Sequence, residues 1–131
     1  MPHVIVEYSA NVDESHDMAA FAKALAEAAS ETGVFPLGGL RVRLYPSEHY
    51  VVADAHPANG FVSLLLRIGA GRDLETKQRA GQLIFDAASA FLADTLAGEH
   101  FMLSLDIQEN DPEVSFKANS VHARLKRDRE A

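Results

Sequence analysis

The sequence predicts an α+β fold in which two βαβ units form one four-stranded mixed sheet with two helices on one face. Three observations lead to this expectation: short alternating apolar runs typical of strands, two longer stretches with apolar residues at helical spacing, and repetition of this order in the second half. A chain of 131 residues is long enough for one core. We therefore expect a single domain, residues 1–131.

The first half contains one complete βαβ unit. His3–Tyr8 alternates and is rich in Val and Ile, which predicts a strand. Apolar residues at helical spacing predict a helix over Asp17–Thr32, and Gly33 stands where a C-terminal cap is expected. The Gly-rich loop that follows leads into a second strand, Leu40–Tyr45. Its two faces carry Leu40, Val42 and Leu44 on one side and Arg41, Arg43 and Tyr45 on the other.

A polar excursion separates the halves. Pro46–Glu48 predicts a turn and His49–Ala53 a brief hairpin return strand, followed by turn-rich residues Asp54–Gly60. The pattern then repeats.

The second half begins with a strand over Phe61–Ile68. Asp73 is expected to cap a second helix that ends at Gly98, and Phe101–Gln108 predicts the last strand. The tail, Asn119–Ala131, mixes basic and acidic residues and is expected to be a frayed, solvated end. The alternative is that its first part packs on a neighbouring subunit.

Composition excludes several classes of function. The chain has 12 Lys and Arg against 19 Asp and Glu, a net charge of -7, which argues against nucleic acid as a partner. It has no cysteine, so disulfides and thiol chemistry are excluded. No long apolar run predicts a membrane span or signal peptide. We expect a cytoplasmic protein.

Pro2 is the most informative single residue. If Met1 is removed, Pro2 has a free secondary amine at the start of a buried strand. An α-amine titrates near pH 8 or just below, and burial beside cations lowers its pKa further. Such an amine can act as a base near neutral pH. In a form that retains Met1 the Pro2 nitrogen is an amide and cannot act as a base, so that form is expected to be nearly inactive. The alternative is that Met-Pro simply begins an ordinary soluble protein.

Four blocks of sequence, in order along nearly the whole chain, carry a family resemblance. They are Met1–Glu7, Thr32–Arg43, Arg67–Arg72 with Leu74 and Glu75, and Phe116–Ala123. Each block alone is a weak signal. Together they resemble the tautomerase superfamily and, within it, the 5-carboxymethyl-2-hydroxymuconate isomerases.

The resemblance implies a tautomerase-like homotrimer. It implies an isomerase of aromatic acid catabolism, such as homoprotocatechuate degradation, that acts on a small anionic dicarboxylate or tricarboxylate. Pro2, Arg41 and Arg72 are the implied catalytic residues, the amine as general base and the arginines on substrate carboxylates. Differences from the family pattern between Tyr45 and Gly60 bear on the exact substrate.

The other candidate residues have structural alternatives. Phe35 and Leu37 are either pocket walls or core residues, and Arg43 is a candidate for substrate contact or for a structural pair. Arg41 can instead form an ion pair between subunits, because a half-apolar sheet face favours a subunit interface. Arg72 can be a solvated loop residue. Lys117, Asn119 and His122 are expected mainly to hold the C-terminal segment in place.

Two other classes of function remain open at this point. One is another unsaturated-acid reaction on the same scaffold, such as decarboxylation, hydration or dehalogenation. The second is a trimeric ligand-binding module without turnover. The six histidines lack metal-site spacing, and Gly69–Gly71 lacks the Lys-Ser/Thr of a phosphate loop. No metal and no cofactor are expected.

Overall fold

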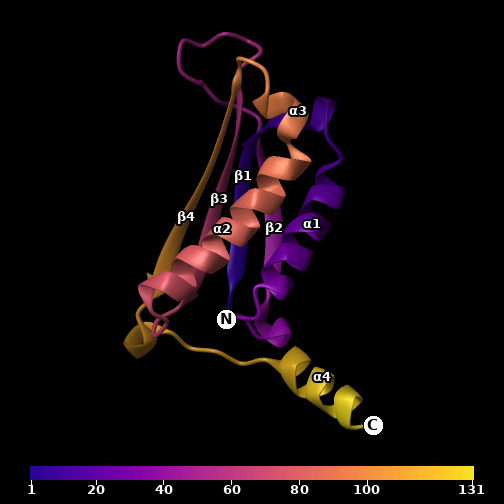
Figure 1. Cartoon of the computed structure of the whole chain (residues 1–131), viewed down its shortest axis with the longest axis vertical. Coiled ribbons are helices and arrows are strands. Elements are labelled where there is room, and N and C mark those ends of the chain that lie inside the picture. The colour runs from indigo at the N-terminus through magenta and orange to yellow at the C-terminus, as the bar shows by residue number, and fades with distance from the viewer.

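Four strands form one mixed sheet in the order β2-β1-β3-β4 (Figure 1). β1 is parallel to β2 and antiparallel to β3, and β3 is parallel to β4. The computed structural model describes all residues, 1–131. The strands are β1 (His3–Ser9), β2 (Arg41–Ser47), β3 (Gly60–Gly69) and β4 (Phe101–Asn110). Helices α1 (Met18–Glu31) and α2 (Leu74–Phe91) cover one face, which confirms the predicted architecture.

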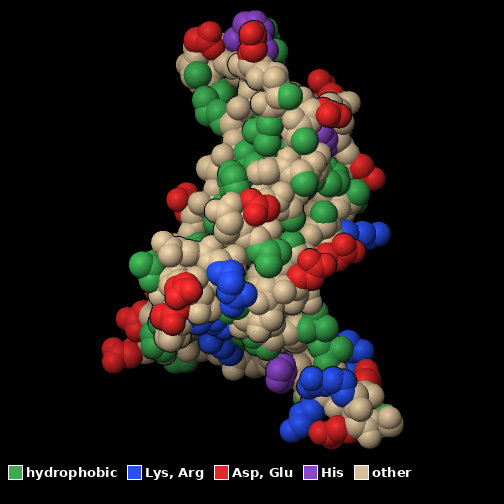
Figure 2. Space-filling view, in the orientation of Figure 1, with side chains coloured by type: hydrophobic (Ala, Val, Ile, Leu, Met, Phe, Trp, Pro, Cys, Tyr) green, Lys and Arg blue, Asp and Glu red, His purple; other side chains and the backbone are tan.

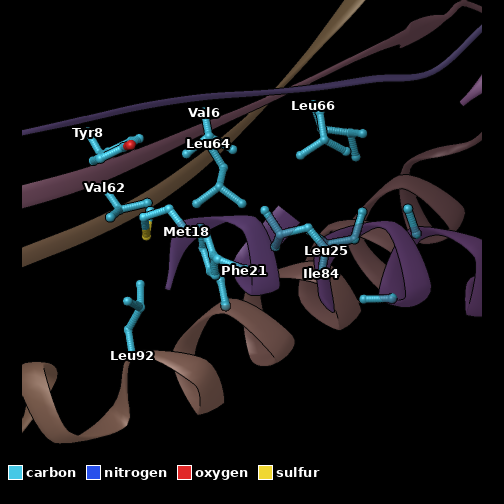
Figure 3. Close-up of a cluster of buried hydrophobic side chains, with 14 of the residues drawn as sticks. Val6, Tyr8, Met18, Phe21, Leu25, Val62, Leu64, Leu66, Ile84 and Leu92 are labelled. Atoms are coloured by element: carbon cyan, nitrogen blue, oxygen red, sulfur yellow. The ribbon is translucent and has the colours of Figure 1, made fainter. Parts of the chain in front are cut away.

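The core lies between that face of the sheet and the two helices. Eighteen buried apolar residues form one cluster (Figure 3). Every second residue of β3 points into it, as the alternation of the sequence predicts. Phe21 and Leu25 of α1 and Ile84 of α2 meet the strand residues there and are fully buried. The remaining face of the sheet is left uncovered within one chain.

Side-chain caps fix where the two main helices begin. The Asp17 carboxylate accepts a hydrogen bond from the Ala20 amide at 3.1 Å, and the Asp73 carboxylate accepts one from Thr76 at 2.8 Å. These bonds satisfy backbone donors that a helix leaves free in its first turn. Gly33 follows α1 with φ of 69°, the left-handed conformation expected after a helix.

The second helix is shorter than predicted. α2 ends at Phe91, and a separate turn, α3 (Ala93–Leu96), follows. Leu92 between them has φ of -100° and ψ of 15°, which is outside helical geometry, and its side chain is fully buried. Placing Leu92 in the core turns the chain before Gly98, so the expectation of one helix up to Gly98 is wrong.

The expected return strand over His49–Ala53 is absent. Residues 48–59 form turns and irregular backbone at the end of the sheet opposite the N-terminus (Figure 1). Ala53 and Ala55 have φ of 51° and 66°, in the left-handed region, which extended strands do not use. Asn59 holds this loop instead, because its amide donates to Val52 O at 3.1 Å and to an Asp54 carboxylate oxygen at 2.7 Å.

The tail is also more ordered than predicted. After β4 come the short helix η3 (Pro112–Val114), an extended stretch and helix α4 (Ser120–Glu130). The chain crosses the base of the sheet, and α4 projects away from the body (Figure 1). Asn119 caps α4 by accepting from the His122 amide at 3.0 Å, and its own amide donates to Gly38 O at 2.8 Å. These contacts anchor the start of a helix that buries no residue of its own.

Candidate active site

Pro2 lies fully buried immediately before β1. Its carbonyl accepts a hydrogen bond from the Arg41 amide at 3.1 Å. Arg41 begins β2, opposite His3 in the parallel register. The structure therefore places Pro2 and Arg41 together, although they are far apart in the sequence.

A cavity of about 470 Å³ opens beside this N-terminal end of β1. His3 lies between Arg41 of β2 and Arg67 of β3 in the sheet register, and these three residues line one side. Met1 lies at the cavity, and the segment that follows β4 lines its remaining sides. The lining here consists of Asn110, at the end of β4, and of Asp111, Val114, Ser115, Phe116, Lys117 and Ala118 after it. The volume of the cavity is within the range of small-molecule sites, about 300–1,000 Å³.

The electrostatic environment of the cavity is positive. Burial and nearby charges lower the pKa of the Met1 α-amine. Those charges are on Lys117, Arg41 and Arg72, and Lys117 also contributes a hydrogen bond. The pKa of the Arg41 guanidinium is lowered by burial and then by Arg43 and Arg67. Burial, with neighbouring arginines, lowers the pKa of His3 to about 4, so its imidazole is neutral at pH 7.

The Arg41 side chain is partly held in place. Its Nε donates to Gly39 O at 3.2 Å, which leaves its two terminal nitrogens as donors toward the cavity side of the sheet. Gly39 itself lies against Met1: a Cβ there would sit 3.1 Å from the Met1 Cγ atom. A larger residue at Gly39 would therefore press on the N-terminus.

Arg72 is not among the residues that line the cavity. Its two terminal nitrogens donate to Gly69 O at 3.2 Å and to Val34 O at 3.3 Å. The guanidinium carbon lies 5.2 Å from the centre of the Phe35 ring, within cation–π range. Phe35 is buried in the core cluster, which favours core packing over a pocket wall. Arg72 is thus fixed on the 33–36 loop, close enough for its charge to act on the N-terminal amine.

Two further predicted residues lie outside the cavity. The Arg43 Nη1 atom is 3.0 Å from His3 Nδ1, so Arg43 contacts the site through His3. Leu37, in the short helix η2 (Leu37–Gly39), is 62% exposed. It lines a separate groove with His122 and Leu125 of α4. Roles in substrate binding for Arg43 and Leu37 remain predictions.

Sequence reasoning did not single out Arg67 and His3, and it assigned Lys117 mainly to anchoring. The alternation of β3 puts Arg67 on the uncovered face with Leu65, which is a signal the sequence does contain. Its position opposite His3 depends on strand register, which the alternation alone does not specify.

The largest hollow is at the other end of the molecule. It measures about 720 Å³, is formed by the loop after β2, and has no lysine or arginine in its lining. Figure 2 shows the same division: Lys and Arg side chains gather in the lower part of this view, while the loop end carries acidic residues and histidine. The cavity at Met1 is therefore the better candidate for an anionic ligand. No group of three or more His, Cys, Asp or Glu side chains is placed to hold a metal ion, and no helix is both long and apolar enough to cross a membrane.

Known proteins are similar to this chain in sequence and in fold. The profile of the 5-carboxymethyl-2-hydroxymuconate isomerase family matches residues 2–125. A 5-carboxymethyl-2-hydroxymuconate Delta-isomerase of Escherichia coli is 36% identical over 126 residues, covering 96% of this chain and all of the relative. The crystal structure of a 5-carboxymethyl-2-hydroxymuconate isomerase from Deinococcus radiodurans R1 is 34% identical, with a TM-score of 0.87, over 95% of this chain and 93% of that one.

A more distant likeness extends to a solved symmetric trimer described as W0 fused 4-OT wild type. It has a TM-score of 0.67 at 20% identity, and the match covers 88% of this chain and 93% of that one. This likeness concerns the fold. The duplicated βαβ sheet with a proline at its first strand defines a tautomerase-superfamily protein. Within that superfamily, the chain belongs to the 5-carboxymethyl-2-hydroxymuconate isomerase family.

Proposed function

We propose that this protein is an isomerase that converts 5-carboxymethyl-2-hydroxymuconate to its unsaturated 2-oxo form. The observation that carries the proposal is the position of Pro2, buried at the start of β1 and hydrogen-bonded through its carbonyl to Arg41, beside a cationic cavity. Membership of the isomerase family supports the same reaction.

The Pro2 amine, free after removal of Met1, is the general base. It takes the proton from the 2-hydroxyl group of the dienol and returns a proton to the carbon at the far end of the diene. The carbon that carried the hydroxyl group becomes the carbonyl carbon of a ketone. One carbon–carbon double bond remains, and it lies between the positions of the original two. One base can do both steps because the substrate is flat and the proton moves along one side of it.

The residues around the N-terminus suit an amine that must be neutral at rest. Burial, Lys117, Arg41 and Arg72 lower the pKa of the Met1 amine. After Met1 is removed, the Pro2 nitrogen lies one residue further into the same environment. The same cations then oppose protonation of the proline and keep a fraction of it available as a base near neutral pH.

Arg41 and Arg72 have different parts in this proposal. Arg41 has free terminal nitrogens at the cavity and binds a substrate carboxylate, which also draws negative charge away from the reacting diene. Arg72 has both terminal nitrogens engaged by backbone carbonyls, so within one chain it supports the reaction through its charge on the amine and by fixing the loop at Phe35.

The protein is proposed to act as a homotrimer in the cytoplasm. The uncovered sheet face carries apolar residues beside charged ones, and Tyr45 and Met102 are each 52% exposed there. Such a face favours a subunit interface. The structural likeness to a symmetric trimer supports three subunits. A stable monomer in sedimentation at working concentration would contradict this assembly.

Ketonisation followed by ultraviolet absorbance tests the reaction directly. The substrate is 5-carboxymethyl-2-hydroxymuconate, and intact mass must show that Met1 is absent. We expect rapid turnover that falls at least a hundredfold when Met1 is retained, because the Pro2 nitrogen is then an amide and a positioned acid–base group contributes about 10²–10⁴-fold. Pro2→Ala replaces the rigid secondary amine by a more mobile primary amine and should also lose most of the turnover. Absence of turnover from correctly processed protein would reject this reaction. Equal turnover in Pro2→Ala would reject the proline base.

A further inference from the structure

Three cations meet at the cavity without a carboxylate partner. Arg41, Arg67 and Lys117 all line it, and none of them forms an ion pair within the chain. The ion pairs present are Lys77–Glu109, Arg124–Asp128 and Arg127–Asp128. Most of the 12 lysines and arginines of the chain lack an ion pair, so what distinguishes Arg41, Arg67 and Lys117 is that they share one cavity.

The cavity contains little negative charge of its own. Its one carboxylate is Asp111, which is exposed and accepts a hydrogen bond from the Glu113 amide at 2.9 Å as the cap of η3. The charges of Arg41 and Arg67 therefore repel each other beside His3 with no internal anion between them. Repulsion of this kind is offset when a carboxylate binds.

The cations come from three separate segments. Arg41 begins β2 and Arg67 stands near the end of β3, each opposite His3. Lys117 is on the extended stretch after η3 that crosses the base of the sheet (Figure 1). If Arg41 serves the carboxylate nearest the Pro2 amine, Arg67 and Lys117 remain for another negative group of the same ligand.

His3 adds a neutral donor to this group. Arginine has only donors, so the 3.0 Å contact from Arg43 makes His3 Nδ1 an acceptor and puts the ring proton on Nε2. With a pKa of about 4, the ring stays neutral at pH 7. It lines the cavity as a hydrogen-bond donor that adds no further positive charge.

We propose that Arg67 and Lys117 form a second carboxylate subsite that makes the enzyme specific for substrates with more than one carboxylate. This inference rests on the proposed function for the assignment of Arg41 to the carboxylate near Pro2. The muconate skeleton has a carboxylate at each end and the carboxymethyl group adds a third, so substrates of this class carry the groups that such a subsite binds. Lys117 thereby links the C-terminal segment to substrate selection.

Calorimetric binding of two unreactive acids separates the subsite from the reaction. trans,trans-Muconate and sorbate have the same six-carbon diene, with two carboxylates and one respectively, and neither has a 2-hydroxyl group to lose a proton. The variants are Arg67→Met and Lys117→Met, and Lys126→Met on exposed α4 is the control with the same change of charge. Arg67→Lys serves if Arg67→Met fails to fold.

We expect the wild-type protein to bind muconate more tightly than sorbate. Arg67→Met and Lys117→Met should each weaken muconate binding roughly tenfold to a hundredfold, which is the range for one charge-assisted hydrogen bond, and leave sorbate binding almost unchanged. Arg67→Lys should weaken muconate binding less, and Lys126→Met should match the wild type.

Several results would overturn the inference. Wild-type protein could bind muconate no better than sorbate, or bind neither acid. Alternatively, Arg67→Met and Lys117→Met could bind muconate as tightly as the wild type does. A protein that prefers muconate through these residues yet fails to turn over the proposed substrate keeps the subsite and loses only the reaction. The two proposals can therefore fail separately.

Discussion

Arg43 on β2 and His3 on β1 are joined across the two parallel strands, with 3.0 Å between Arg43 Nη1 and His3 Nδ1. The contact orients a histidine that also lines the cavity and stands opposite Arg41 and Arg67 in the sheet. A ring held in this way cannot accept a second proton on Nδ1 without losing the Arg43 contact. His3 therefore connects strand pairing to the charge state of the site.

The pH dependence of stability should reflect this arrangement. The pKa of His3 is about 4 in the folded protein and near 6.5 when the chain is unfolded. Between these values the unfolded chain binds a proton that the folded protein does not bind, so lowering the pH favours unfolding. The His3 contribution is thus complete above about pH 6.5 and decreases as the pH falls toward 4.

Urea unfolding at pH 7.5, 5.5 and 4.5 measures this contribution. His3→Gln should lose less free energy of unfolding over this range than the wild type, because glutamine does not titrate. His49→Gln, at an exposed position in the loop after β2, is the control and should keep the wild-type slope. Equal slopes for wild type and His3→Gln would contradict the prediction.

The contacts of Arg72 predict a structural role for its side chain. Arg72→Ala removes two hydrogen bonds to backbone carbonyls and the contact with the Phe35 ring, so we expect a loss of about 1–3 kcal/mol in the free energy of unfolding. Arg72→Lys keeps the charge but cannot span both carbonyls. It should recover part of the activity while remaining less stable than the wild type.

Phe35→Leu checks the aromatic part of this interaction. It keeps a buried apolar side chain but removes the ring face, so denaturant unfolding should show a smaller loss than Arg72→Ala, of about 1 kcal/mol, with most of the activity kept. Wild-type stability in Arg72→Ala would show that the guanidinium is not holding the 33–36 loop.

Features of this chain that depend on nearby residues were predictable from the sequence, and features that depend on contacts between distant residues were not. The main strands and helices were predictable because their apolar spacing is local, as in β3 and α1. The Leu92 break, the turns around Asn59 and the anchoring of α4 depend on contacts with distant residues, which periodicity does not encode. The tail in particular lacks an apolar stripe, because α4 buries nothing.

The candidate site follows the same division. Pro2 and Arg41 were identifiable from residue chemistry and family resemblance, and the hydrogen bond between them places both at the end of the sheet where the cavity opens. Their catalytic roles remain predictions. The place of Arg67 in the cavity lining follows only from the antiparallel register of β3 with β1. The place of Lys117 follows only from the path of the tail. Leu37 was a candidate for a pocket wall or for a core residue. It lines the groove against α4, and its role in substrate binding remains a prediction.

The loop after β2 should depend on one side chain. Asn59 is 8% exposed, and its amide makes three side-chain contacts: to Val52 O, to Asp54, and to His100 Nδ1 at 2.9 Å. Asn59→Ala removes all three contacts, while Val52 O keeps its bond from the Ala55 amide and Asp54 keeps its bond from the His56 amide, so the change should cost about 1–2 kcal/mol in the free energy of unfolding. Hydrogen exchange should increase over residues 48–59.

This effect should stay local to the loop end of the sheet. The cavity lies at the opposite end, near Met1, so the Michaelis constant of processed Asn59→Ala protein should equal that of the wild type. Asn59→Asp keeps the size of the side chain but puts a second carboxylate beside Asp54, and it should destabilise the protein as well. A stable Asn59→Ala protein with unchanged exchange would refute the role given to Asn59.

The docking of α4 can be tested by one added methyl group. A Cβ at Gly38 would lie 2.6 Å from His122 Nδ1 and 2.8 Å from His122 Cα, closer than such atoms approach. Because the Cα belongs to the backbone of α4, Gly38→Ala should displace the helix and strain the 2.8 Å bond from Asn119 to Gly38 O. Amide exchange should increase in residues 120–130 while the core keeps its protection.

Gly69→Ala is the matched control for this change. No atom lies within 4 Å of a Cβ at Gly69, and its φ is not in the left-handed region, so exchange in α4 should stay as in the wild type.

Lys117 precedes α4 by three residues, so displacement of the helix should also loosen the cavity segment. Gly38→Ala should then bind muconate several-fold more weakly, in the direction of Lys117→Met but to a smaller extent, because Lys117 itself is kept. Unchanged exchange in α4 would mean that the helix does not rest on Gly38. Increased exchange with unchanged muconate binding would mean that the position of Lys117 is set by the stretch after β4 and not by the helix.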